Sequence, residues 1–169
     1  MSDDTRILSV RGLNVQIPIP GSTLWPVRDV NIDVGRGETV AVVGESGCGK
    51  SLTALAIMGL LPRQAKVQSE ALRLNAESLA EASPKRWRQL RGDRIAMIFQ
   101  DPMTALDPCY RIGDQMCEIL QQHRKISRSA AMKRSLDLLG KVGIPAPEER
   151  LKQYPHQLSG GLRQRVMIA

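Results

Sequence analysis

Aromatic residues are scarce in this sequence: they make up 3% of its 169 residues and include a single phenylalanine. Proteins that bind single-stranded nucleic acid stack the bases on aromatic side chains, so this scarcity argues against that class of protein. The net charge of +7 permits nucleic acid or an anionic membrane surface as a partner but demonstrates neither. Because the basic residues are spread along the chain, a solvated basic face is the simpler interpretation.

Cysteines are few, and Cys48, Cys109 and Cys117 match neither a disulfide framework nor a metal-binding spacing. We expect free thiols in a reducing compartment, with Cys109 and Cys117 as small, partly buried residues. The sequence also lacks a run of eighteen apolar residues, and its acidic first residues contain no apolar segment. It therefore predicts neither a membrane span nor a secretion signal, and favours a soluble, cytoplasmic protein.

The first part of the chain predicts β-structure of two kinds. Residues 7–17 and 27–34 alternate apolar and polar side chains, which is typical of antiparallel strands with one buried face. Residues 39–43 are continuously apolar and mostly β-branched, which indicates a strand covered on both faces, as in a parallel sheet. Residues 95–99 predict a second buried strand of this kind, and a short strand is expected near Leu72.

Helical patterns fill most of the remaining chain. The predicted helices cover residues 52–61, 84–90, 112–120, 127–142 and 162–169. Pro84 is expected in the first turn of its helix, and Ser127 is expected to cap the next-to-last one. Three prolines between residues 145 and 155 predict an irregular connection. The pattern as a whole indicates an α/β fold in which a mixed sheet precedes a helical insert.

A glycine-rich loop follows the predicted strand 39–43. Its residues are Gly44, Glu45, Ser46, Gly47, Cys48, Gly49, Lys50 and Ser51. The glycines leave the backbone amides free to surround phosphate groups, and the helix that follows adds partial positive charge at its N-terminus. In this pattern Lys50 reaches the β- and γ-phosphates and the Ser51 hydroxyl ligates Mg²⁺. Strand, loop and helix occur in the order of a nucleotide-binding fold, so the sequence predicts binding of a nucleoside triphosphate.

A second glycine loop consists of Ser159, Gly160 and Gly161. Taken alone it is either a flexible turn or an anion site at the start of the predicted helix 162–169. Together with the first loop it resembles the signature motif of ABC-type ATPases, and residues 97–104 resemble their Q-loop region. The three motifs occur in the order found in that family. Within the family, the sequence is most similar to the importers of dipeptides, oligopeptides and nickel. Residues 44–47, 101–104, 111–115 and 154–157 carry this closer resemblance.

The resemblance implies an ABC-type core of the P-loop NTPase class, with an incomplete parallel sheet, antiparallel N-terminal strands and a helical subdomain. It places a nucleotide-binding core in residues 1–102 and the helical subdomain in residues 103–157. The signature motif and the start of its helix would then occupy residues 158–169.

The resemblance also implies cofactors and roles for individual residues. ATP and Mg²⁺ would be bound, with Ser51 and Gln100 as the residues that contact the metal. Gln100 would in addition position the attacking water. Ser159, Gly160 and Gly161 would contact the γ-phosphate of an ATP molecule held by a second ATP-binding subunit, identical or different.

The partners implied by the resemblance are those of a transporter. Integral membrane permease subunits would dock on residues 103–107, from Met103 to Asp107, and a periplasmic solute-binding protein would take part indirectly. The chain would lie peripherally on the cytoplasmic face of the inner membrane, and no nucleic acid is expected.

Two features depart from the family pattern. An aromatic side chain that stacks on adenine usually lies in the early strands, but Ile17 and Ile19 occupy that region and Trp25 is expected to be a packing residue. An apolar strand ending in Asp-Glu, which supplies the general base and a Mg²⁺ ligand, is absent from these 169 residues. We therefore expect unpaired strand edges, exposed apolar faces, a poorly stable isolated chain and no ATP turnover.

Three functions remain open on this basis. The first is the ATP-binding subunit that powers bacterial import of peptides or similar small solutes. The second is a soluble ABC-type ATPase that acts on nucleic acid. The third is a truncated, non-enzymatic remnant that binds nucleotide without hydrolysing it, because the family consists of ATPases whereas this chain lacks the catalytic carboxylates.

Overall fold

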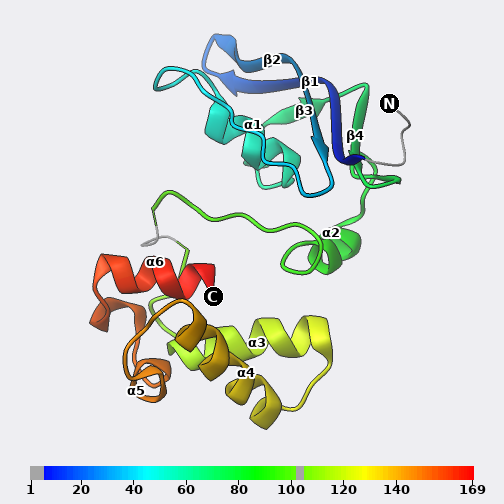
Figure 1. The fold of residues 1–169 in the computed structure, drawn as a ribbon. Helices are drawn as coiled ribbons and strands as arrows, with labels where there is room; N and C mark the ends of the chain where they lie inside the picture. The colour runs from blue at the N-terminus through cyan, green and yellow to red at the C-terminus, as the bar shows by residue number, and fades with distance from the viewer. Residues whose placement is uncertain (1–5, 102–104) are drawn as a thin grey trace. The chain divides into compact units, whose positions relative to one another are not determined.

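The computed structural model describes residues 6–101 and 105–169 and divides the chain into two compact units, Met1–Arg91 and Gly92–Ala169 (Figure 1). The first unit contains the β-sheet and two helices. The second unit is helical. Among the residues that the structure describes, no helix is long and apolar enough to cross a membrane.

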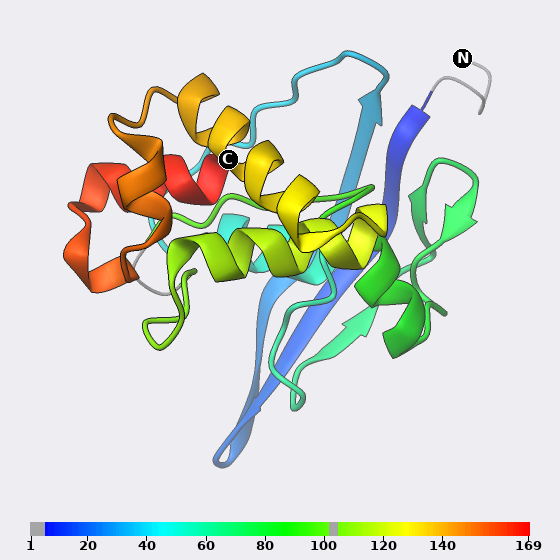
Figure 2. The same cartoon turned by 90° about the horizontal axis from the view of Figure 1, so that it is seen from below.

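A long antiparallel hairpin forms the centre of the first unit, and its two strands lie side by side in Figures 1 and 2. The strands of the sheet are β1 (Arg6–Ile19), β2 (Ser22–Gly35), β3 (Lys66–Gln68), β4 (Ala71–Leu74) and β5 (Glu77–Ser78). Their order is β2-β1-β4-β5, with β3 paired to β1, and every pairing is antiparallel. The two predicted alternating strands and the strand near Leu72 are thus confirmed.

A β-bulge shifts the buried face of β1. Val10 pairs with Ile32 and Leu13 pairs with Val30, so β1 contains one residue more than β2 between these two pairs. Gly12 takes a left-handed conformation there, with a φ of 58°, which glycine adopts at little cost. The bulge keeps Val10 and Leu13 on the buried side despite their odd spacing, and both are fully buried.

The two predicted buried strands do not form in the part of the chain that the structure describes. Residues 39–43 pair with no strand, and of residues 95–99 only Ile95 forms an isolated bridge, in which its carbonyl oxygen accepts a hydrogen bond from the Gly92 amide at 2.9 Å. Each pairing of the sheet involves β1 or β4 instead. A strand covered on both faces needs a hydrogen-bonded strand on each side, and neither segment has one. Val43 is 88% exposed and Ile98 is 58% exposed. The parallel part of the expected sheet is therefore not observed, whereas the expected exposure of apolar side chains is confirmed.

Two helices complete the first unit. Helix α1 (Lys50–Ile57) follows the glycine-rich loop, and helix α2 (Pro84–Leu90) matches its predicted bounds. Ser83 caps α2, because its hydroxyl accepts a hydrogen bond from the Arg86 amide at 3.2 Å.

The second unit contains helices α3 (Ile112–Arg124), α4 (Arg128–Lys141), α5 (Pro147–Leu151) and α6 (Gly160–Ile168), with a short 3₁₀ helix η2 (Pro155–Gln157) before α6. Ser127 caps α4 as predicted, accepting a hydrogen bond from the Ala130 amide at 3.2 Å. The prediction of an irregular connection between residues 145 and 155 is wrong in part, because helix α5 lies within this segment. Pro147 occupies the first turn of α5. Backbone amides in the first turn donate no hydrogen bond within the helix, so the missing N–H of proline costs no helical hydrogen bond there.

An apolar core holds the helices of the second unit together. Its buried members are Ile112, Met116, Leu139, Ile144, Leu151, Leu158 and Val166. They come from α3, α4, α5, α6 and the connections between these helices. The segment that carries the second glycine loop is thereby anchored on both sides, by Leu158 before it and Val166 after it.

Two expectations about single side chains are wrong. Trp25 is 42% exposed and does not act as a packing residue, because it lies near the turn of the hairpin, where residues 18–25 are all exposed. Cys109 is exposed in the connection before α3, whereas Cys117 is fully buried in α3. All three cysteines are free thiols, as expected.

Asp33 on β2 makes the stability of the hairpin depend on pH. Arg11 donates a hydrogen bond to one of its carboxylate oxygens, and Ser9 Oγ donates to the other at 3.0 Å. The Arg11 hydrogen bond is the main cause that holds the pKa of Asp33 below its usual value of 3.8. The resulting stabilisation is complete above that unfolded-state pKa and is lost as the pH falls through the lower folded-state pKa.

We expect Asp33→Asn to remove this dependence, because the amide carries no charge to titrate. Thermal unfolding from about pH 5 to about pH 2.5 should show a smaller loss of melting temperature for Asp33→Asn than for the unsubstituted chain. Asp137→Asn, on an exposed position of α4, is the matched control and should behave like the unsubstituted chain. Parallel curves for all three proteins would contradict the assignment.

Candidate functional site

The glycine-rich loop is shaped by contacts that exclude side chains. Gly49 has a φ of 95°, and a Cβ atom at this position would lie 2.3 Å from the Pro26 carbonyl oxygen on β2. A Cβ atom on Gly44 would lie 2.7 Å from Cys48 Sγ. Gly47 also takes a left-handed conformation, with a φ of 84°, but a Cβ atom there would meet nothing within 4 Å. Gly49 is thus required by both conformation and space, and Gly47 by conformation alone.

Lys50 folds back over the loop that precedes it. Its Nζ donates hydrogen bonds to the carbonyl oxygens of Gly44 at 2.8 Å and Glu45 at 2.7 Å, and it lies 3.4 Å from Cys48 Sγ. The ammonium group therefore bridges the two ends of the loop. It brings a positive charge to the same place as the loop amides.

The N-terminus of α1 adds to this positive potential. Gly49 is the N-cap and offers no side chain to the first-turn amides, and the first turn contains no acidic residue. The Thr53 amide makes the first helical bond, to the Gly49 carbonyl oxygen at 2.8 Å, so the amides of residues 50–52 have no acceptor within the helix. Ser51 is the second residue of α1 and is exposed. Glycine loop, ammonium group and helix N-terminus together are suited to bind an anion.

The second glycine loop has a different character. Ser159 is the N-cap of α6, and its Oγ accepts a hydrogen bond from the Leu162 amide at 3.4 Å. A Cβ atom on Gly160 or Gly161 would meet nothing within 4 Å. The described residues of the second unit therefore do not require glycine at either position, in contrast to the neighbours of Gly49. Arg163 in α6 links the helix to the segment before the loop, because its Nε donates a hydrogen bond to the Pro155 carbonyl oxygen at 2.6 Å.

Gln100 is exposed at the end of the unpaired segment 95–99. Of the predicted docking segment, Met103 and Thr104 lie outside the described residues. The structure places its last residue, Asp107, in a loop fixed by the side chain of Gln115. Gln115 Nε2 donates to the carbonyl oxygens of Asp107 and Tyr110, both at 2.9 Å, and its Oε1 accepts from the Asp107 amide at 3.0 Å. The phosphate loop belongs to the first unit, and Gln100 and the second loop belong to the second.

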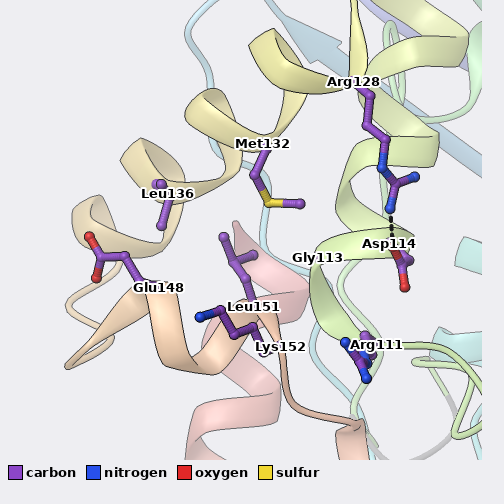
Figure 3. Close-up of a pocket in the computed structure, with 9 residues that line it drawn as sticks. All are labelled: Arg111, Gly113, Asp114, Arg128, Met132, Leu136, Glu148, Leu151 and Lys152. Atoms are coloured by element: carbon purple, nitrogen blue, oxygen red, sulfur yellow. Dashed lines mark hydrogen bonds and ion pairs between the residues drawn. The ribbon is translucent and has the colours of Figure 1, made fainter.

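A hollow of about 440 Å³ lies among α3, α4 and α5 in the second unit (Figure 3). It is lined by Arg111, Gly113, Asp114, Arg128, Met132, Leu136, Glu148, Leu151 and Lys152. Met132, Leu136 and Leu151 give it apolar walls, and charged side chains surround them. The sequence analysis missed this hollow. The one signal in the sequence is the apolar face of the predicted helix 127–142, which is equally typical of a helix packed in a core.

The model of the ABC transporter family matches residues 27–169 of this chain. The chain therefore belongs to the ABC transporter family. The solved dimeric structure of the ATP-binding cassette MJ0796 bound to ADP and Pi covers 95% of this chain with a TM-score of 0.79, at 24% sequence identity and over 67% of its own length. At this identity the likeness shows the fold, and it confirms the expected ABC-type α/β class.

The curated relatives of the chain include peptide transport proteins. The dipeptide transport ATP-binding protein DppD of Bacillus subtilis is 53% identical over 97% of this chain and 49% of its own length. The oligopeptide transport ATP-binding protein OppD of the same organism is 46% identical over 98% of this chain and 46% of its own length. The resemblance to this group is thus confirmed. The chain spans about half the length of the curated relatives it matches.

The contrast between Gly49 and Gly47 gives a matched pair of substitutions. Gly47→Ala places an alanine at positive φ, which costs on the order of 1–3 kcal/mol. Gly49→Ala carries the same strain and adds the overlap with the Pro26 carbonyl oxygen, so we expect a clearly larger loss of unfolding free energy. Urea denaturation of both variants measures the difference. Equal losses would mean that the loop moves away from β2 without cost.

Proposed function

We propose that this chain is the ATP-binding portion of a subunit that powers ABC-type import of peptides or similar small solutes across the bacterial inner membrane. The observation that carries the proposal is the phosphate loop. Its glycines leave the backbone amides accessible, and both the Lys50 ammonium group and the N-terminus of α1 lie beside them. The identity to peptide transport ATP-binding proteins, 53% for one of them, supports the choice of solute class.

In this proposal the loop amides bind the phosphates of ATP, and Lys50 exchanges its contacts with Gly44 and Glu45 for contacts with the β- and γ-phosphates. The exchange is favourable because a phosphate oxygen carries more negative charge than a carbonyl oxygen. Residues 44–51 are the nucleotide-binding residues.

The side chains near the phosphate loop suit a Mg²⁺ ion whose ligands come mostly from the nucleotide. Among the residues that the structure describes, no group of three or more His, Cys, Asp or Glu side chains could hold a metal ion. Mg²⁺ is commonly bound by substrate phosphates, water and few protein groups, and the exposed Ser51 hydroxyl at the start of α1 supplies one such group. Gln100 is the second proposed contact. When bound, the ion would neutralise charge on the phosphates.

The second glycine loop is proposed to act on another subunit's nucleotide. No described residue of their own unit requires the absence of a Cβ atom at Gly160 or Gly161, and we infer that it allows the approach of another molecule. Ser159 offers a hydroxyl at the N-terminus of α6, where a phosphate is favoured. A dimer of ATP-binding subunits, identical or different, would bring such a phosphate to Ser159.

Lys50→Ala tests the nucleotide site. We expect it to weaken binding of a fluorescent ATP analogue by at least about tenfold, because it removes a charge-assisted contact to phosphate. Lys66→Ala, on the exposed strand β3, is the control and should bind normally. We also expect the chain alone to bind the analogue without steady turnover of ATP. An ATPase rate that is abolished by Lys50→Ala would overturn this part of the proposal, and unchanged affinity would overturn the site.

The hollow of Figure 3 is proposed to extend the permease-docking segment 103–107. Gln115 fixes the loop that joins the two, and Arg111 both ends that loop and lines the hollow. An apolar wall with charged groups around it suits a short apolar helix of a membrane subunit.

Lys152→Glu reverses a charge at the edge of the hollow without touching the phosphate loop. We expect it to reduce co-purification with the integral membrane subunits while binding of the ATP analogue stays unchanged. Lys133→Glu, an exposed position of α4 that does not line the hollow, should leave co-purification intact. Equal recovery of membrane subunits with both variants would contradict docking at this hollow.

A further inference from the structure

Arg91 binds the C-terminal end of α1, the helix whose N-terminus carries the phosphate loop. Its Nε donates to the Met58 carbonyl oxygen at 2.9 Å, and its Nη2 donates to the Gly59 carbonyl oxygen at 2.6 Å. The guanidinium carbon lies 4.7 Å from the centre of the Trp87 ring in α2. Arg91 therefore ties the C-cap of α1 and the residue after it to α2 by two hydrogen bonds and a cation–π contact.

These contacts use properties that only arginine combines. The last carbonyl groups of a helix lack donor partners within it and carry partial negative charge, so a cation with several donors is favoured there. The N–H groups at the edge of the planar guanidinium can donate hydrogen bonds to two carbonyl oxygens while its face makes a cation–π contact with an indole ring. Burial lowers the pKa of Arg91, which agrees with a guanidinium partly withdrawn from water.

The packing around Arg91 leaves no spare room. Gly59 follows the C-cap of α1 with a φ of 62°, and a Cβ atom there would lie 2.9 Å from both Arg91 Nη2 and atoms of the Trp87 ring. The end of α1 thus meets Arg91 and Trp87 at contact distance, and a shift of either side chain is transmitted directly to the helix end.

We propose that Arg91 is a positioning residue for the phosphate loop, an inference that rests on the nucleotide-binding function proposed above. Helix α1 has eight residues and is about 12 Å long, so it moves as one short rod. Gly49 holds its first end against Pro26, and Arg91 holds its second end. Releasing the second end lets α1 tilt about the first, which displaces Lys50 and the first-turn amides from the phosphates.

The test compares affinity with stability in variants of the full chain. Arg91→Met keeps an apolar stem on Trp87 but removes both hydrogen bonds, and we expect it to weaken binding of the fluorescent ATP analogue by about tenfold. Arg91→Lys keeps the charge and can reach one carbonyl oxygen, so its affinity should fall between those of Arg91→Met and the unsubstituted chain. Arg63→Met, at an exposed position of the same unit, should bind normally.

Affinities are measured at a temperature at which circular dichroism shows every variant to be folded. Weaker binding by folded Arg91→Met, with partial recovery in Arg91→Lys, supports positioning. A lowered melting temperature with affinity within twofold of the unsubstituted chain would overturn it, because Arg91 would then serve stability alone. If Arg91→Met does not fold, the affinity of Arg91→Lys decides. Normal binding by Lys50→Ala would show instead that the proposed nucleotide site itself is wrong.

Discussion

The close approach of Gly49 to the Pro26 carbonyl oxygen is the constraint on which the candidate site depends. It joins the start of α1 to β2, and β2 is held by its long pairing with β1. Because the contact leaves no space for a Cβ atom, the chain passes into the helix at a fixed point and with a left-handed residue. Lys50 comes next and can therefore fold over the loop that lies before it. The hairpin, the loop and the helix form one continuous backbone support for a phosphate group.

The two loops are both rich in glycine, but the reason why glycine occurs differs between them. In the first, neighbouring atoms of the same chain exclude a side chain at Gly44 and Gly49. In the second, no described residue of the same unit excludes one at Gly160 or Gly161. Glycine that its own fold does not need is most simply explained by the close approach of another molecule. This difference is consistent with the proposal that the first loop binds the nucleotide of its own chain and the second that of another subunit, and composition alone could not reveal it.

Local signals in the sequence predicted those elements that are stabilised locally. Pro84 and Ser127 mark helix starts through effects within one turn, and the phosphate loop depends on a motif of eight consecutive residues. The strands at 39–43 and 95–99 failed because a strand depends on neighbours that its own residues do not encode. The hollow was missed for a related reason: Met132 and Leu136 look like core residues until the packing of α3 and α5 is known. Arg91 carried no motif, since its role arises from the meeting of α1 with α2.

The exposed segment before the phosphate loop has a consequence for the behaviour of the chain in solution. Val40, Val42 and Val43 are exposed, strand-forming side chains on a backbone that joins no ladder. Such a segment is a template on which a second copy can add a strand, and growth of this kind leads to aggregates. Gly44 follows Val43 directly, so a copy paired there would crowd the loop that Lys50 closes. Self-association of this kind would therefore compete with the proposed phosphate binding for the same short stretch of backbone, and nucleotide would then oppose aggregation as protein concentration rises.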